Sequence, residues 1–183
     1  MSKTIIFSRR FPAHHPNSDD ATYFIEKILN WYWDQPNQKY NSVPDMFKEL
    51  NPEKDYSLER VLRSLNEEER DIKSHTIRAG KRWKVGDKFS PRVWSGKPYN
   101  SKQIIICPDI EIKKIFDFVV IPFPDKSFRI YVDYKTADDQ IINDIALNDG
   151  LSYREFLDWF LTKETKRHGF KGQIICWNEN ISY

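Results

Sequence analysis

The sequence predicts an α+β fold in which short strands form a partly closed small barrel and helices flank it. Strand-like runs separated by Gly, Pro, Asn and Asp fill the middle of the chain, and segments with helix start signals lie before and after them. The length of 183 residues fits one domain with an elaboration better than two full domains. We therefore expect a single domain spanning 1–183.

The first part of the chain predicts one strand and then a helical insertion. Thr4 to Phe7 is a short apolar strand candidate, and Asn17 to Asp20 supply helix N-cap residues. After that cap, apolar residues recur at helical spacing, namely Tyr23, Phe24, Ile28, Leu29 and Tyr32. A second helix is expected from Val43 and a third over Tyr56 to Leu65. The insertion therefore covers about 13–72, and its aromatic residues should dock it on the barrel.

The rest of the chain predicts strands first and helices later. The strand candidates are His75 to Arg78, Lys88 to Trp94, Gln103 to Cys107, Ile110 to Ile121, Ser127 to Tyr134 and Lys171 to Trp177. Pro122 to Lys126 is expected to be a hairpin loop. One helix is predicted over Asp138 to Leu147, and Ser152 caps another that runs through Phe156 and Phe160.

Composition excludes several classes of protein. Hydrophobic residues make up 39% of the chain and charged residues 31%, as in soluble globular proteins. No apolar run approaches the ~20 residues that a membrane helix needs, and no signal peptide is evident, so we expect a cytoplasmic protein without a membrane partner. Cys107 and Cys176 lack metal-ligand spacing, and so do the histidines. We expect no metal site and no cofactor.

Positive charge is concentrated in one stretch. From Lys73 to Lys102 there are nine Lys or Arg and one acid, Asp87, whereas the whole chain has a formal net charge of only +2. Aromatic residues lie among these cations, a mixture that suits a polyanion with stackable bases. The expected nucleic-acid or ligand contacts are Arg78, Lys81, Arg82, Trp83, Lys84, Arg92, Trp94, Lys97, Tyr99 and Lys102. The loop Ser95 to Tyr99 is predicted to form part of the binding rim.

Two motifs resemble the ASCH family of PUA-like β-barrel proteins. Lys73, Thr76 and Arg78 match a Lys-x-x-Thr-x-Arg segment of an early strand, which is followed by a Gly-Asp turn, here Gly86-Asp87. The run 146–151 and its following aromatic residues resemble the late segment of that family. The resemblance covers the first strand and everything from Lys73 onward, but not the helical insertion.

The resemblance implies a PUA-like barrel and a candidate catalytic set. In the ASCH amidohydrolases that deacetylate N4-acetylcytidine, a lysine, a threonine and a glutamate form the active site; Lys73, Thr76 and Asp149 match these positions, with aspartate in place of glutamate. A lysine of lowered pKa can take the threonine proton, and the hydroxyl can then attack an amide carbonyl. The alternative is that Lys73 and Arg78 hold an anion while Asp149-Gly150 is an ordinary turn. His75 alternates with Thr76 and is expected to face away from a pocket that Thr76 faces.

Three functions remain open. The first is an RNA- or nucleotide-binding module with a basic, aromatic-lined pocket, which a positive groove would favour. The second is an amidohydrolase acting on a modified cytidine, which convergence of Lys73, Thr76 and Asp149 in a deep pocket would favour. The third is a protein-interaction domain that uses the helical insertion, which a large exposed aromatic patch on Trp31, Tyr32 and Trp33 would favour.

Overall fold

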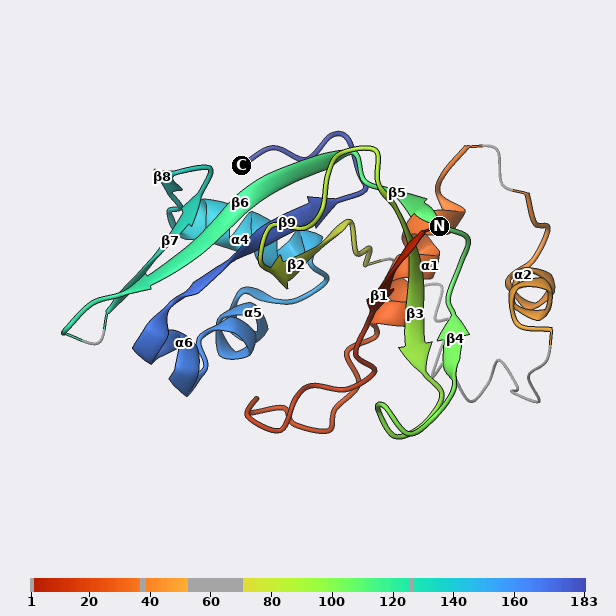
Figure 1. Ribbon diagram of the computed structural model, residues 1–183, viewed down its shortest axis with the longest axis horizontal. Coiled ribbons are helices and arrows are strands. Elements are labelled where there is room, and N and C mark those ends of the chain that lie inside the picture. The colour runs from red at the N-terminus through yellow and green to blue at the C-terminus, as the bar shows by residue number, and fades with distance from the viewer. Residues whose placement is uncertain (1, 37–38, 53–70, 126) are drawn as a thin grey trace.

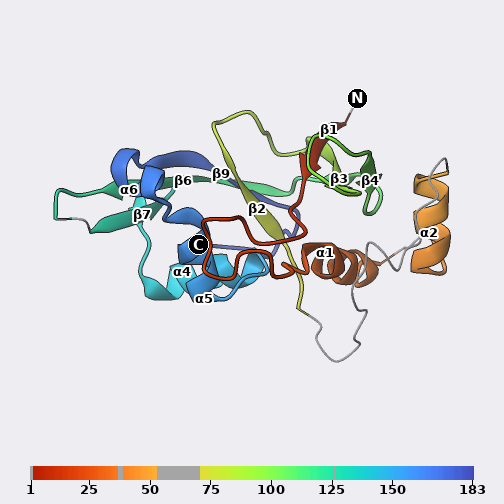
Figure 2. The same cartoon turned by 90° about the horizontal axis from the view of Figure 1, so that it is seen from below.

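The computed structural model describes residues 2–36, 39–52, 71–125 and 127–183. It confirms the α+β class: these residues form two β-sheets and five helices, with α1 beneath the first sheet and α4 and α5 against the second (Figures 1 and 2). A third helix, predicted over Tyr56 to Leu65, lies outside the described residues.

The first sheet is built around β3 (Lys88–Trp94). Its neighbours are β1 (Lys3–Ile6), which is parallel to β3, and β4 (Gln103–Ile105) and β5 (Ile110–Glu111), which are antiparallel to it. Lys3 pairs with Phe89 and Ile6 with Arg92, so the N-terminal strand lies against a segment that follows more than eighty residues later. Phe89 and Val93 point into the core, whereas Lys88 and Arg92 alternate with them.

The second sheet has the order β2-β9-β6-β7-β8, and all of its pairs are antiparallel. Its strands are β2 (His75–Ala79), β6 (Lys114–Pro122), β7 (Phe128–Val132), β8 (Lys135–Thr136) and β9 (Phe170–Cys176). The hairpin of β6 and β7 extends beyond the helices (Figure 1). The strand predicted at Lys171 to Trp177 thus pairs with the strand predicted at His75 to Arg78.

The expected partly closed barrel is not confirmed, because the described strands form two sheets and no closed barrel is found among them. The run Ile110 to Ile121, expected as one strand, is divided: β5 belongs to the first sheet and β6 to the second. Between them, Ile112 exchanges backbone hydrogen bonds with Gly86 and Asp87, and Lys113 N donates to Cys176 O. This crossing separates the strands into two sheets, and it leaves β1 in a different sheet from β2.

Three helices cover the second sheet or its connections. They are α4 (Asp139–Asn148), α5 (Tyr153–Phe160) and α6 (Lys163–His168), of which the last was not predicted. Ser152 and Glu155 form the capping box that begins α5. Phe156 from α5 packs its ring against Phe118 of β6, at the centre of the buried face of this sheet.

The described part of the insertion is helical and docks on the sheets. α1 (Phe24–Trp33) buries Trp31 against Trp177, and α2 (Val43–Leu50) buries Met46. At the end of α2, the Asn51 side chain donates to Ile105 O and accepts from Ile105 N, which extends the hydrogen bonding of β4. None of the helices in the described ranges is long and apolar enough to cross a membrane.

Candidate functional site

The chemistry of the interior centres on Lys73 and Asp149. Lys73 Nζ lies 2.5 Å from Asp149 Oδ1 and donates also to the backbone oxygen of Asp149. The two side chains are 1% and 6% exposed, so the ion pair is shielded from solvent. Two of the three residues of the predicted catalytic set are therefore in direct contact.

Aromatic rings enclose the ammonium group. Lys73 Nζ lies 4.0 Å from the centroid of the Phe24 ring and 5.9 Å from that of Phe7, distances at which cation–π attraction operates. Burial lowers the pKa of Lys73 from 10.5 to about 8, although the Asp149 carboxylate opposes the change. Burial also raises the pKa of Asp149, and Lys73 and Arg78 oppose that rise. Burial thus brings the pKa values of the two groups closer together than they are in water.

Local structure fixes both partners. Asp149 is the C-cap of α4, and its N–H bonds to carbonyls of that helix. Gly150 follows with a φ of +75°, which favours glycine, and a Cβ there would lie 3.0 Å from Lys27 Cδ and 3.5 Å from Lys73 Cβ. Lys73 N donates to Lys27 O, and Trp177 Nε1 donates to Lys73 O. The Asp-Gly sequence therefore both ends the helix and lets the lysine approach.

His75, and not Thr76, faces the carboxylate. His75 Nε2 lies 3.8 Å from Asp149 Oδ1, beyond hydrogen-bond length, and its Nδ1 is 3.0 Å from the Tyr183 hydroxyl. Side chains alternate along β2, so Thr76 points to the opposite side of the strand. Among the described residues, the Thr76 hydroxyl makes no hydrogen bond to Lys73 or Asp149. Direct convergence of the three predicted catalytic residues is thus absent from this conformation.

Arg78 links the ion pair to the first sheet. Its Nη2 donates to Ile6 O at 2.9 Å, and its guanidinium carbon lies 5.5 Å from the Phe7 ring centroid. Arg78 is close enough to Asp149 to favour the ionised carboxylate. The third motif residue therefore joins β2 to β1 and adds positive charge near the pair.

The cations after Arg78 divide into two groups. Lys81, Arg82 and Lys84 precede β3, whereas Lys97 and Lys102 follow it. The seven-residue strand, which itself carries Lys88 and Arg92, holds the two groups about 20 Å apart. Lys81 is paired with Asp117, and the backbone N–H of Lys84 donates to Asp87. The sequence cluster thus does not form one compact patch, because β3 is extended.

Trp83 and Arg92 have structural contacts. Trp83 is 3% exposed, its ring packs edge-on against Phe89, and its backbone N–H and C=O bond to the Gln173 side chain. Arg92 donates to Ser90 on its own strand and to Gln103 on β4. Trp83 has no accessible ring face for a ligand in this conformation.

A groove lies at the end of β3 where the first sheet meets its loops. It has a volume of about 540 Å³, and its lining includes Phe7, Arg9 and Arg10 from the segment after β1, Trp94 at the end of β3 and Tyr99 from the β3–β4 connection. The Trp94 and Tyr99 rings are 5.5 Å apart at 50°, and Tyr99 is 88% exposed. None of the described residues that line the groove is acidic. Of the predicted contacts, Trp94 and Tyr99 line this groove, and Lys97 belongs to the same loop.

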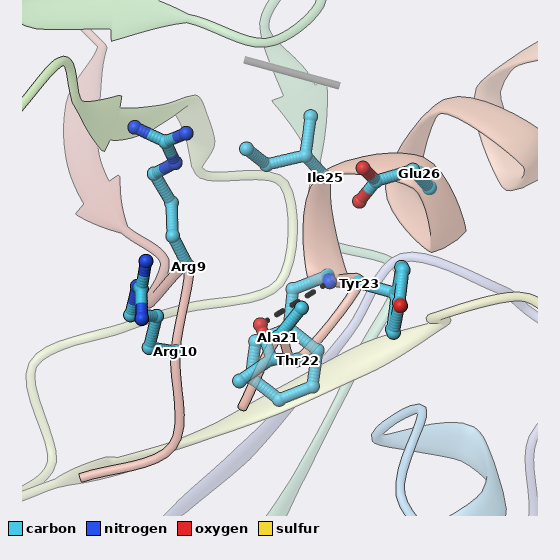
Figure 3. A pocket seen from close by; sticks show the side chains of 8 residues that line it. Arg9, Arg10, Ala21, Thr22, Tyr23, Ile25 and Glu26 are labelled. Carbon is cyan, nitrogen blue, oxygen red and sulfur yellow. Dashed lines mark hydrogen bonds between the residues drawn. The ribbon is translucent and has the colours of Figure 1, made fainter. Parts of the chain in front are cut away.

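A second, much smaller pocket adjoins the start of α1. Arg9 and Arg10 line it together with residues 21–26, and Figure 3 shows the two arginine side chains pointing the same way with Glu26 across from them. The dashed line in that figure is the bond from Phe24 N to Thr22 Oγ1. The volume of this second pocket, about 20 Å³, is too small for more than a water molecule. Arg10 donates to Asp19 O and makes no ion pair with the described part of the chain.

Sequence reasoning missed the residues that arrive from the N-terminal segment. Arg9 and Arg10 are not among the expected contacts, and two adjacent cations directly after the first strand were the signal that could have identified them. Phe7 is shared: it lines the groove, and its ring contacts Lys73 and Arg78. By contrast, Trp31 is buried and Tyr32 and Trp33 pack against the core, so the aromatic patch expected of an interaction helix is not present on these residues.

Among the described residues, no group of His, Cys, Asp and Glu is arranged to hold a metal ion. Comparison with models of known protein families, with curated proteins and with solved structures found no match to this chain. The ASCH resemblance therefore continues to depend on the motif residues themselves.

Proposed function

We propose that this chain is an RNA- or nucleotide-binding module of the ASCH and PUA-like type, and that the groove beside β3 is its binding site. The observation that carries the proposal is the convergence of Arg9 and Arg10 with Trp94 and Tyr99, which come from segments far apart in the sequence. Cations attract phosphates, and exposed aromatic rings offer stacking faces to bases. A groove of about 540 Å³ is also within the usual range for small-ligand sites.

Two cations at the groove, Arg10 and Lys97, are available to a ligand. Arg10 makes no ion pair within the described residues, and neither does Lys97. No carboxylate among the described lining residues competes with an incoming phosphate. An anionic ligand would therefore displace counterions and not a protein side chain, which gives binding a marked dependence on salt.

The experiment measures the fluorescence anisotropy of a labelled, unstructured RNA oligonucleotide as the protein is titrated at several salt concentrations. The wild-type affinity should fall steeply with salt, and Arg10→Glu/Lys97→Glu should weaken binding at least ten-fold and reduce the salt slope. The matched control is Lys135→Glu/Lys166→Glu, which makes the same change in net charge at exposed positions on β8 and α6. Equal losses in the two variants, or salt-independent binding, would refute the groove as the site.

A second candidate function is hydrolysis of an acylated cytidine, favoured by one observation. Lys73 has its pKa lowered to about 8 and contacts Asp149, the arrangement needed for a lysine that exchanges protons near neutral pH. Two observations favour binding over turnover. The Lys73–Asp149 pair is buried away from solvent, and the Thr76 side chain points to the opposite side of β2. The test incubates the purified protein with N4-acetylcytidine: turnover by the wild type that disappears in Lys73→Ala and Thr76→Ala would reverse this ranking.

A further inference from the structure

The shape of the groove restricts the kind of nucleic acid that it can accept. A protein that reads a duplex inserts a protruding helix or strand into a groove of the nucleic acid. Here the aromatic and cationic side chains line a hollow in the protein, between the segment after β1 and the β3–β4 loop. A base enters such a hollow only when it is unpaired, because a paired base is held inside its own helix.

Two aromatic residues form one side of the hollow, one on a paired strand and the other on a loop. Trp94 lies on β3, is half-buried and is held by pairing with Gln103 of β4. Tyr99 stands on the loop, is 88% exposed and has a φ of +64°. Their rings are tilted by 50° to each other. Trp94 therefore provides a fixed face, whereas Tyr99 can adjust its ring to a base without disturbing the core.

The cations stand where the backbone of such a strand would pass. Arg9 Nη1 contacts Ser95 O at 3.4 Å, so the arginine segment adjoins the start of the aromatic loop. Arg10 lines the same groove, and Lys97 projects from the loop between Trp94 and Tyr99. Phosphates on either side of a bound base would thus meet positive charge on both sides of the hollow.

We propose that the groove binds a single unpaired nucleotide of an RNA strand, with its base against Trp94 and Tyr99 and its flanking phosphates beside Arg10 and Lys97. This inference rests on the proposed function and adds two requirements to it: the strand must be unpaired at the site, and binding must depend on the Tyr99 ring. Stacking on an aromatic side chain is tolerant of sequence, so bases of different kinds should be accepted.

The experiment compares one labelled RNA strand alone and annealed to its complement, at fixed salt, with four proteins. The proteins are the wild type, Tyr99→Ala, Tyr99→Phe and Tyr134→Ala. Tyr134 is the matched control because it is 84% exposed with a φ of +67°, nearly the values of Tyr99, but lies in the β7–β8 turn. Loss of a stacked ring should weaken single-strand binding roughly ten-fold or more.

The expected result is that the wild type binds the single strand at least ten-fold more tightly than the duplex. Tyr99→Ala should lose most of that preference, while Tyr99→Phe and Tyr134→Ala should keep it. Equal binding of strand and duplex, or equal loss in Tyr99→Ala and Tyr134→Ala, overturns this inference and leaves RNA binding itself intact. Absence of binding to either form overturns both this inference and the proposed function.

Discussion

Lys73 and Asp149 neutralise each other inside the protein, with Nζ and Oδ1 2.5 Å apart and the centroid of the Phe24 ring 4.0 Å from Nζ. A buried charge that loses its partner is costly, whereas removing both charges together is often tolerated. The pair therefore makes stability depend on both residues jointly.

Asp149→Leu should lower the free energy of unfolding by about 3–5 kcal/mol, because it leaves the Lys73 ammonium buried without its carboxylate. Lys73→Met/Asp149→Leu should recover a large part of that loss. Urea unfolding of the two single variants and the double variant gives the coupling energy. Lys81→Met, which breaks the exposed pair with Asp117, is the control and should leave the midpoint almost unchanged. Additive effects of the two buried substitutions would contradict this prediction.

The stability of the protein should rise with pH above about 8 because of Lys73. Its pKa is about 8 in the folded protein against 10.5 ordinarily, so between these values the unfolded chain binds a proton that the folded chain has released. Stability increases with pH wherever the unfolded state holds more protons. Urea unfolding at pH 7 to 10 should show this rise in the wild type and a smaller one in Lys73→Met. Parallel curves for the two proteins would show that Lys73 titrates normally.

Acid should destabilise the protein in part through His75. Burial and the nearby Lys73 charge lower the pKa of His75 well below 6.5. Below pH 6.5 the histidine therefore binds a proton in the unfolded chain but stays neutral in the folded chain. Stability is thus lost as the pH falls through 6.5. Nitrogen-detected NMR should find the His75 ring neutral at pH 5.5, and His75→Gln should show a shallower loss between pH 6.5 and 5. A charged ring at pH 5.5 would exclude this account.

Gly172 should not tolerate a side chain. A Cβ at this position on β9 would lie 2.4 Å from Arg78 O and 2.7 Å from a ring carbon of Phe170. Gly172→Ala should therefore cost about 1–3 kcal/mol as the strands shift apart. The control is Gly96→Ala, whose Cβ would meet Ser101 Cβ at an ordinary 3.6 Å. Thermal unfolding that ranks the two substitutions equally would contradict the close approach of β2 and β9.

Local signals in the sequence were sufficient for most elements but not for their arrangement. The capping box at Ser152 and Glu155 marks the start of α5, and the alternation of Lys88 to Trp94 gives β3 with its bounds. The expected barrel is not confirmed because Ile112 and Lys113 carry the chain between two sheets, through backbone bonds to segments distant in sequence. Nothing in the apolar run around them signals that crossing.

The candidate site, too, was predicted only in part from the sequence. Lys73 and Asp149 were paired through a motif resemblance, and the structure brings them into contact. Trp83 looked like a ligand residue because it lies among cations, but Gln173 of β9 holds its backbone in the core. Arg9 and Arg10 were missed because their proximity to Tyr99 depends on the parallel pairing of β1 with β3, which is long-range.

The pairing of β1 with β3 also has a consequence for synthesis. Lys3 meets Asp87 across 84 residues of chain, so the ribosome makes the first strand long before it makes the strand that receives it. Until then β1 remains an unpaired edge with exposed backbone groups, a state that invites association between nascent chains. Assembly of the groove must wait for that late pairing, and deletion of the first ten residues would remove an edge strand and both groove arginines together.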